Sequence, residues 1–395
     1  MIGGIRISRI GDYIKRTDVV YWLLTLTASV FGCLLIASTQ RDGEVDFLKT
    51  QIFAILIGYG AAIVISAIDY NVIAKCWWLT GGVAIALTVM VFYIGIQVAG
   101  TDDVGWIRLP GGLTFQPSEL TKICFILTFS KHLSYLAEHD KLHRFRWVMT
   151  LVIHAAVPVV MIHMQGDDGA ALVFGCMFLI MSFAAGVQLR YFIALIAAAG
   201  AALPLMWFGV LNEDQKNRLM VLFSDDPAML QSYGWQQYQG KISIASGGVT
   251  GKGLFSGPRV GQEIVPYQEN DFIFTVAGEE LGFIGCAAIL LLFVLIMIFT
   301  LRTAAVACNM QGRLICTGFF ALLATQAAVN IGMVLGLLPV VGITLPFFSS
   351  GGSSAACLYL GVGLVQSVYM HPSDNRDIPV KAELSHTVRG TMFPA

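Results

Sequence analysis

The sequence predicts an all-α integral membrane protein with ten transmembrane helices. Its 395 residues are 56% hydrophobic and only 12% charged, and the mean hydropathy is +0.73. A soluble domain is about 45–50% apolar and about 25% charged, so this composition excludes a soluble globular fold. So much apolar surface also excludes disorder for most of the chain. The net charge of −1 provides no basic surface, and we predict no nucleic-acid partner.

Ten segments are apolar and long enough, or nearly so, to cross a bilayer core, which takes about 20 residues per helix. They are residues 19–38, 51–68, 77–99, 113–130, 147–163, 170–185, 191–211, 282–301, 314–336 and 355–370. The first is longer than the apolar core of a signal peptide, about 7–15 residues, and is expected to be retained. The sixth and tenth are short, and the fourth carries charges.

The distribution of Lys and Arg predicts the orientation. With the N-terminus inside, the inner loops and termini carry about twice as many of these residues as the outer loops, as the positive-inside rule requires. We therefore expect a cytoplasmic segment at 1–18, a membrane domain at 19–370 and a cytoplasmic tail at 371–395. The long loop at about 212–281, between the seventh and eighth helices, falls outside. Its apolar residues predict partial order.

Polar residues in four places on the outer side are candidates for function. In the first, Trp106 and Arg108 lead into the fourth helix, where Glu119 and Lys122 share one face because they are three residues apart. Burial of both charges is costly unless they pair or meet a ligand. A structural ion pair explains the two charges equally well, and Trp106 alone is more typical of an interfacial anchor.

The other three places are turns and loops. Gln165 and Asp167 lie in an Asp-Gly turn, and Lys252 stands between two glycines of the long loop. Asp271 directly precedes an apolar run, where a low dielectric raises the pKa of a carboxyl group and suits it to act as a general base. A helix N-terminal aspartate is the alternative. The break at 339–354 is rich in glycine and hydroxyl groups, includes Ser353, and predicts a cavity wall.

Cysteines and histidines add little. None of the eight cysteines falls in an outer loop, so we predict no disulfides. His132, His139 and His143 are expected in one cytoplasmic loop, where a solvated basic loop is favoured over a metal site.

Several of these residues lie in motifs that resemble one family. They are Trp106-Ile107, Gln116-Pro117-Ser118-Glu119 with Lys122, Ser246 to Gly253, Asn270 to Phe274 with Glu279-Glu280, and Asn330 to Ser354. In this order, over residues 15–370, the chain resembles the SEDS family (shape, elongation, division and sporulation; the RodA, FtsW and SpoVE type).

The resemblance implies a peptidoglycan glycosyltransferase that polymerises lipid II, with inversion, on the outer face of the bacterial cytoplasmic membrane. Asp271 corresponds to the family's essential aspartate, and it is the expected general base. Expected partners are a class B penicillin-binding protein, lipid II and the polyprenyl-pyrophosphate-linked glycan. The candidates for substrate binding are Trp106, Arg108, Glu119, Lys122, Gln165, Asp167, Lys252 and Ser353. A divalent cation (Mg or Mn) is the one cofactor considered, with no ligands assigned, and no organic cofactor is expected.

Three departures from the family pattern affect the contacts with substrate. Gly105 stands where a basic residue is common, Gly166 replaces a proline, and Ser350 replaces a tyrosine. Two other functions stay open: a lipid II flippase, and a non-catalytic scaffold for a penicillin-binding protein. The sequence does not choose between roles in elongation, division and sporulation.

Overall fold

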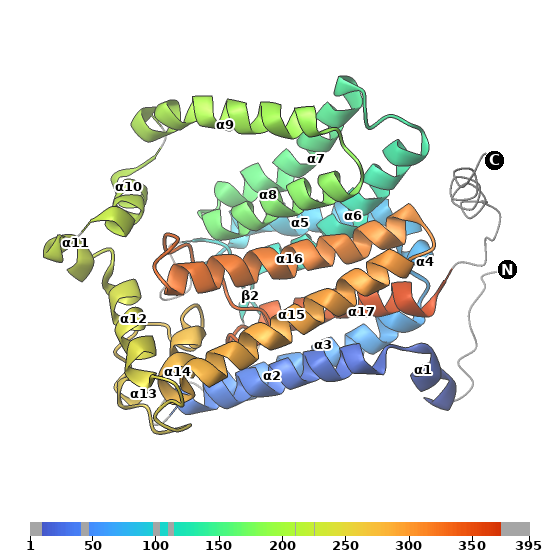
Figure 1. Ribbon diagram of the computed structural model, residues 1–395. Helices are drawn as coiled ribbons and strands as arrows, with labels where there is room; N and C mark the ends of the chain where they lie inside the picture. Colours follow the sequence, from blue (N-terminus) through green and yellow to red (C-terminus); the bar gives the residue numbers. More distant parts are fainter. Residues whose placement is uncertain are drawn as a thin grey trace, which may run out of the picture.

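The computed structural model describes residues 10–40, 47–97, 103–109, 114–209, 211–224 and 226–372, and it is a mostly helical bundle (Figure 1). In these ranges a long helix occupies each of the ten predicted segments. They are α2 (Val19–Thr39), α3 (Phe47–Ala67), α5 (Trp77–Ile94), α6 (Pro117–Glu138), α7 (Phe145–His163), α8 (Asp168–Ala184), α9 (Leu189–Gly209), α15 (Gly282–Val306), α16 (Met310–Val334) and α17 (Gly352–Met370). The outermost parts of the predicted cytoplasmic ends, 1–9 and 373–395, lie outside the described residues.

Eight of these helices, counted over the described ranges, are long and apolar enough to cross a membrane, so the chain is a multi-pass membrane protein. The other two are α6 and α8. The α8 helix has only 17 residues, and α6 is less apolar because it carries Glu119, Lys122 and Lys131. The α6 helix also ends at Glu138, two turns beyond the predicted 113–130 segment, since polar residues alternate there with buried leucines.

Short elements connect the long ones. The connection after α9 is folded into helices, and these lie together at one end of the bundle (Figure 1). Its first helix, α10 (Glu213–Met220), starts with a capping box between Asn212 and Gln215, and Asp226 caps α11 (Pro227–Gln231). The short elements are α1 (Ile10–Arg16), α4 (Tyr70–Lys75), β1 (Ile107–Arg108), β2 (Thr114–Phe115), α10 (Glu213–Met220), η1 (Val221–Phe223), α11 (Pro227–Gln231), α12 (Trp235–Gly247), α13 (Pro258–Gly261) and α14 (Ile273–Glu280). The strands β1 and β2 form an antiparallel hairpin.

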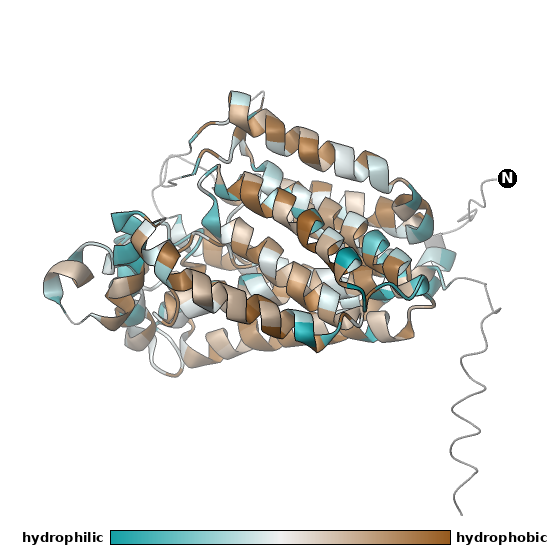
Figure 2. Cartoon of the chain, turned by 90° about the horizontal axis from the view of Figure 1, so that it is seen from above, coloured by the Kyte–Doolittle hydropathy of each residue, from teal (hydrophilic) through white to brown (hydrophobic). Residues whose placement is uncertain are grey.

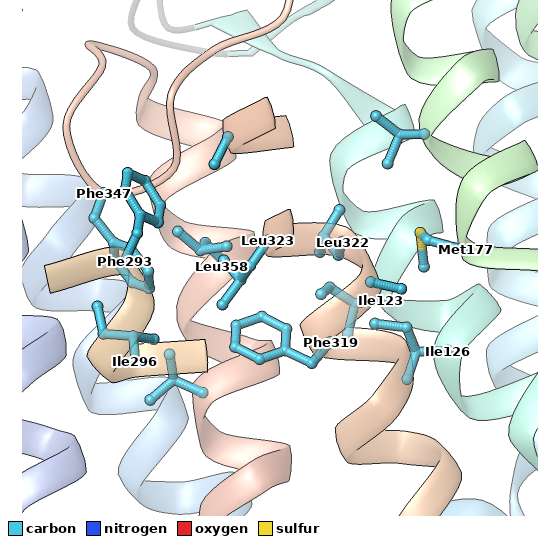
Figure 3. Packing of buried hydrophobic residues seen from close by; sticks show 14 of the residues in the cluster. Ile123, Ile126, Met177, Phe293, Ile296, Phe319, Leu322, Leu323, Phe347 and Leu358 are labelled. Atoms are coloured by element: carbon cyan, nitrogen blue, oxygen red, sulfur yellow. The ribbon is translucent and has the colours of Figure 1, made fainter. Parts of the chain in front are cut away.

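The centre of the bundle is built around α16 and α17, most of whose residues are buried. Figure 3 shows Phe319 of α16 surrounded by apolar side chains from α6, α15 and α17. Small residues let α17 lie against α3: a Cβ at Gly363 would come within 2.7 Å of Ala62 O. Close approach through small residues is typical of helices packed in a membrane. Figure 2 shows hydrophobic residues along the helices, and many large apolar side chains of the long helices are exposed, as a lipid environment requires.

The segment between α16 and α17 is not helical, yet it enters the bundle. Ile343, Leu345 and Phe348 are buried, and Phe347 adopts a left-handed conformation with φ 68°. Gly32 of α2 leaves room for this segment, because a Cβ at residue 32 would lie 2.6 Å from Phe348 Cα. Irregular backbone at this depth needs internal hydrogen-bond partners, and those partners lie at the candidate site.

Candidate active site

Asp271 is held where two irregular segments of the chain meet. Asn330 of α16 donates from Nδ2 to the carbonyl oxygens of Asp271 (2.7 Å) and Ile343 (2.6 Å). The Ser349 hydroxyl donates to Asn270 O (2.6 Å). These bonds fix the backbone of the predicted catalytic aspartate against the glycine-rich break.

The first two predicted places form one hydrogen-bonded group around Asp167. Asp167 Oδ2 accepts from Gln116 Nε2 (3.0 Å) and Ser118 Oγ (3.4 Å), while Oδ1 accepts from Ala170 N and caps α8. The backbone N of Gln116 donates to the predicted binding residue Ser353 (3.3 Å to Oγ). The start of α6, the start of α8 and the start of α17 therefore converge at this point.

Glu119 and Lys122 form an ion pair on α6. This is one of the two interpretations that the sequence left open. Lys122 Nζ lies 2.7 Å from Glu119 Oε1, and only 2% and 12% of the two side chains is exposed. Both charges act on Asp167: Lys122 lowers the pKa of Asp167, and Glu119 raises it. The pair is thus both a structural ion pair and part of the electrostatics of the site.

Asp271 lies in an acidic environment, although part of its residue surface stays exposed. Burial raises the pKa of Asp271 to about 7, and neighbouring carboxylates add to the shift. These are Asp103, Asp167 and Glu269. Burial likewise raises the pKa of Asp167 to about 6, helped by Asp103 and opposed by the hydrogen bond from Ala170 N. A carboxyl group with a pKa near 7 exchanges protons readily at neutral pH.

The segment around Trp106 borders the same group. Ile96 N donates to Trp106 O (2.7 Å), and Val104 N donates to Gln165 O (3.0 Å). The Gln165 side chain donates to Thr88 O of α5 (2.9 Å), so it organises the backbone here. Trp106 Nε1 is buried with no hydrogen-bond partner in the described part of the chain.

The neighbours of Trp106 explain one departure from the family pattern. A Cβ at Gly105 would lie 2.7 Å from the Asp103 carboxylate, so glycine leaves room for that carboxylate beside the site. Arg108, in β1, is exposed to solvent.

Lys252 lies apart from this group. It donates from Nζ to Glu279 Oε1 (3.4 Å), with 31% of its side chain exposed. Glu279 is at the end of α14, and Asp271 precedes the start of that eight-residue helix. Lys252 therefore contacts α14 near the end of the helix that is remote from Asp271.

Two adjacent buried carboxylates, Glu279 and Glu280, hold the glycine-rich loop, and residue patterns alone did not single them out. Glu280 accepts from the backbone N of Phe255 and of Gly257 (3.1 Å each) and from Ser38 Oγ of α2 (2.6 Å). Glu279 accepts from Arg259 N (2.9 Å). This carboxylate pair anchors the end of α14, and it thereby helps to place Asp271 at the other end. The signals in the sequence were the doublet itself and its place in a motif of the resemblance, which assigned it no role.

Metal coordination was also considered. Across the described ranges, no group of three or more His, Cys, Asp or Glu side chains is arranged to hold a metal ion. The divalent cation therefore stays a prediction without a built site in these ranges.

The family model described as "Cell cycle protein" and named for FtsW, RodA and SpoVE matches residues 17–374. The chain belongs to the FtsW/RodA/SpoVE family. It is 34% identical over 368 residues to a "Probable peptidoglycan glycosyltransferase FtsW" of Geobacter sulfurreducens, with 90% of this chain and 95% of the relative covered. It is 30% identical over 354 residues to the "Peptidoglycan glycosyltransferase MrdB" of Escherichia coli K12, with 90% and 94% covered.

Solved structures of the FtsW/RodA/SpoVE type share the fold. A chain from a study described as "Structural coordination of polymerization and crosslinking by a peptidoglycan synthase complex" matches with TM-score 0.78 and 25% identity, covering 91% of this chain and 99% of that one. The rod shape determining protein RodA of Thermus thermophilus matches with TM-score 0.67 and 24% identity, covering 91% and 98%. The second likeness concerns the fold alone.

Replacement of Glu280 by Gln tests the carboxylate pair. The amide cannot accept all three hydrogen bonds, and at least one buried N–H loses its partner, which costs about 1–3 kcal/mol. We expect Glu280→Gln to lower the Tm of the detergent-purified protein by several degrees. Glu213→Gln, at an ion pair whose carboxylate side chain is 81% exposed, should leave the Tm nearly unchanged. Equal effects of the two substitutions would contradict the anchoring role.

Proposed function

We propose that the chain is a peptidoglycan glycosyltransferase that polymerises lipid II, with Asp271 as the general base. Its curated relatives carry the glycosyltransferase name. The observation that carries the role of Asp271 is the position of its carboxyl group, whose pKa burial raises to about 7, on backbone fixed by Asn330. The polar group around Asp167 supports a site for a sugar substrate beside it.

The proposed reaction transfers the growing glycan, which is the donor, from its polyprenyl pyrophosphate to an acceptor lipid II. An acceptor lipid II presents the 4-hydroxyl of its sugar to Asp271, and the carboxylate takes the hydroxyl proton. The oxygen forms a bond to the anomeric carbon of the growing glycan from the face opposite the leaving group. The bond between that carbon and the pyrophosphate oxygen breaks, and polyprenyl pyrophosphate leaves with the electron pair. The configuration at the anomeric carbon inverts.

Positive charge must stabilise the departing pyrophosphate. Lys122 is a candidate for this role because its charge acts on Asp167 within the site. Glu119 already neutralises part of the Lys122 charge. Arg108 is exposed on the neighbouring strand β1, where a ligand can reach it. Lys252 is bound to Glu279, and for it we propose mainly the support of the loop.

We also propose the ten-crossing topology, with both termini in the cytoplasm and the site on the outer face of a bacterial cytoplasmic membrane. A class B penicillin-binding protein is the proposed partner, since one structural relative comes from a complex of polymerisation and crosslinking. Cys76 and Cys308 provide a test of orientation, because both are exposed at helix ends on the proposed inner side. An impermeant maleimide should label them in inverted vesicles only. Labelling in right-side-out vesicles would reverse the topology.

The function is tested by lipid II polymerisation with purified protein and a class B penicillin-binding protein from the same organism. Asp271→Asn should reduce glycan synthesis by about 10²–10⁴-fold, the usual contribution of a general base. Asp214→Asn, the same change at an exposed carboxylate of the same connection, should retain activity. Full activity of Asp271→Asn would exclude the general-base role. Translocated lipid II without polymer would favour the flippase, and the absence of both would favour the scaffold.

The raised pKa of Asp271 predicts the pH dependence of the rate. Only the deprotonated carboxylate accepts a proton, so the rate should fall about tenfold per pH unit below the pKa and level off above it. With a pKa of about 7, the fall begins near neutral pH and not near pH 4, where an ordinary aspartate titrates. Initial rates of polymerisation measured across the range should show this break, and a profile flat down to about pH 5 would be inconsistent with it.

A further inference from the structure

Four basic side chains gather where the connection between α6 and α7 meets the start of α9, at the end of α6 opposite the candidate site. This basic cluster consists of Lys141, Arg144, Arg146 and Arg190. Arg190 Nη2 donates to His143 O (2.8 Å), and the Tyr191 hydroxyl donates to the same oxygen (2.9 Å). These two hydrogen bonds hold the first turn of α9 against the connection, so positive charges from both elements lie together.

The charges of the basic cluster have no carboxylate partner. Among the residues that the structure describes, no Asp or Glu side chain lies within ion-pair distance of any of the four. The connection itself contains two acidic residues, Glu138 and Asp140, and both are exposed. The Asp140 carboxylate faces His143 instead, at 3.6 Å from Nδ1. The cluster therefore presents an excess of positive charge that an anion from outside the chain can neutralise.

Aromatic rings hold two of these cations near each other. Lys141 Nζ lies 4.4 Å from the centroid of the Trp147 ring and 4.8 Å from that of the Tyr135 ring. The Arg146 guanidinium lies 5.8 Å from the same Trp147 ring. The two charges are thus no more than about 10 Å apart, roughly one Debye length, and they repel each other. Trp and Tyr are enriched where a membrane meets water, which is the level of the lipid headgroups.

An exposed apolar stripe leads away from the basic cluster along α7. Phe145, Met149, Ile153 and Val157 follow one another at four-residue intervals and share one face of the helix, and 37–64% of each residue is exposed. The Phe145 ring also contacts the Tyr191 ring, at 6.4 Å between centroids, and this contact joins the stripe to the cluster. A charged end followed by an apolar face on a membrane-spanning helix matches the headgroup and acyl chain of a phospholipid.

We propose that the basic cluster binds the phosphate of an anionic phospholipid, such as phosphatidylglycerol, with an acyl chain along the α7 stripe. Lys and Arg form charge-assisted hydrogen bonds to phosphate oxygens, and basic pockets between membrane helices recognise anionic headgroups. The bound lipid bridges the α6–α7 connection and α9. The α9 helix lies at the edge of the bundle (Figure 1), and the apolar window that would cross the membrane has no buried residue. The proposal does not depend on the glycosyltransferase activity.

The test uses the full-length chain, purified in detergent and freed of bound lipid. Phosphatidylglycerol and phosphatidylcholine are titrated separately, and native mass spectrometry counts the lipid molecules bound. Each Lys or Arg near an anionic headgroup contributes about fivefold in affinity, so Lys141→Gln/Arg146→Gln should weaken phosphatidylglycerol binding about 10–30-fold. The matched control Lys75→Gln/Arg313→Gln removes the same charge from two exposed residues on the same proposed side, and it should bind like the wild type.

Equal affinity of the wild type for the two lipids would overturn the proposal. Equal weakening by the two double variants would also overturn it, because that result indicates general surface charge and no site. Glycerol phosphate, which lacks acyl chains, should not displace an equal concentration of phosphatidylglycerol, and displacement would assign the cluster to a soluble phosphate compound. Thermal unfolding identifies a double variant that fails to fold. The exposed single change Arg144→Gln then decides: about fivefold weaker binding supports the proposal, and unchanged binding contradicts it.

Discussion

The rest of the site depends on Asn330, which supplies the hydrogen bonds that buried backbone carbonyl groups need. Two segments of irregular backbone enter an apolar bundle, where an unpaired carbonyl would be costly. One buried amide on a central helix donates to both, at Asp271 O and Ile343 O. Because the side chain is fully buried in α16, it ties these loops to one of the most buried helices of the bundle. The aspartate is thereby placed by the core and not by loop geometry alone.

The acidic side chains of this region differ in role because their surroundings differ. Asp271 and Asp167 lie near other carboxylates in a low dielectric, and burial raises the pKa of each. Glu280 is at least as buried, yet its oxygens accept hydrogen bonds from two backbone N–H groups and a serine. The first kind of carboxylate is suited to proton transfer, and the second to holding a loop. The short helix α14 connects the two.

Family membership and local chemistry contribute separately to the functional argument. The match over residues 17–374 gives the family, and the relatives' names give the glycosyltransferase activity that we propose for this chain. The geometry adds which groups can act together: Gln116, Ser118 and Asp167 form one cluster, while Lys252 belongs to the support of the loop. The expectation that His132 lies in a solvated loop is wrong, because α6 continues to Glu138 and the ring contacts His154 of α7, with 3.1 Å between the Nδ1 atoms.

The sequence by itself determined the membrane class and a helix at each predicted segment, because hydropathy is a local property of the chain. It did not find the length of α6, since the polar residues after 130 hid a helix whose leucines face inward. It gave Asn330 and Glu280 only as members of motifs, without their contacts, and it did not find the contact between His132 and His154. The role of each residue depends on a contact with atoms that lie 59, 25 and 22 residues away along the chain, respectively. A buried amide, a carboxylate anchor and facing imidazoles are defined by what they touch, and only the tertiary structure decides those contacts.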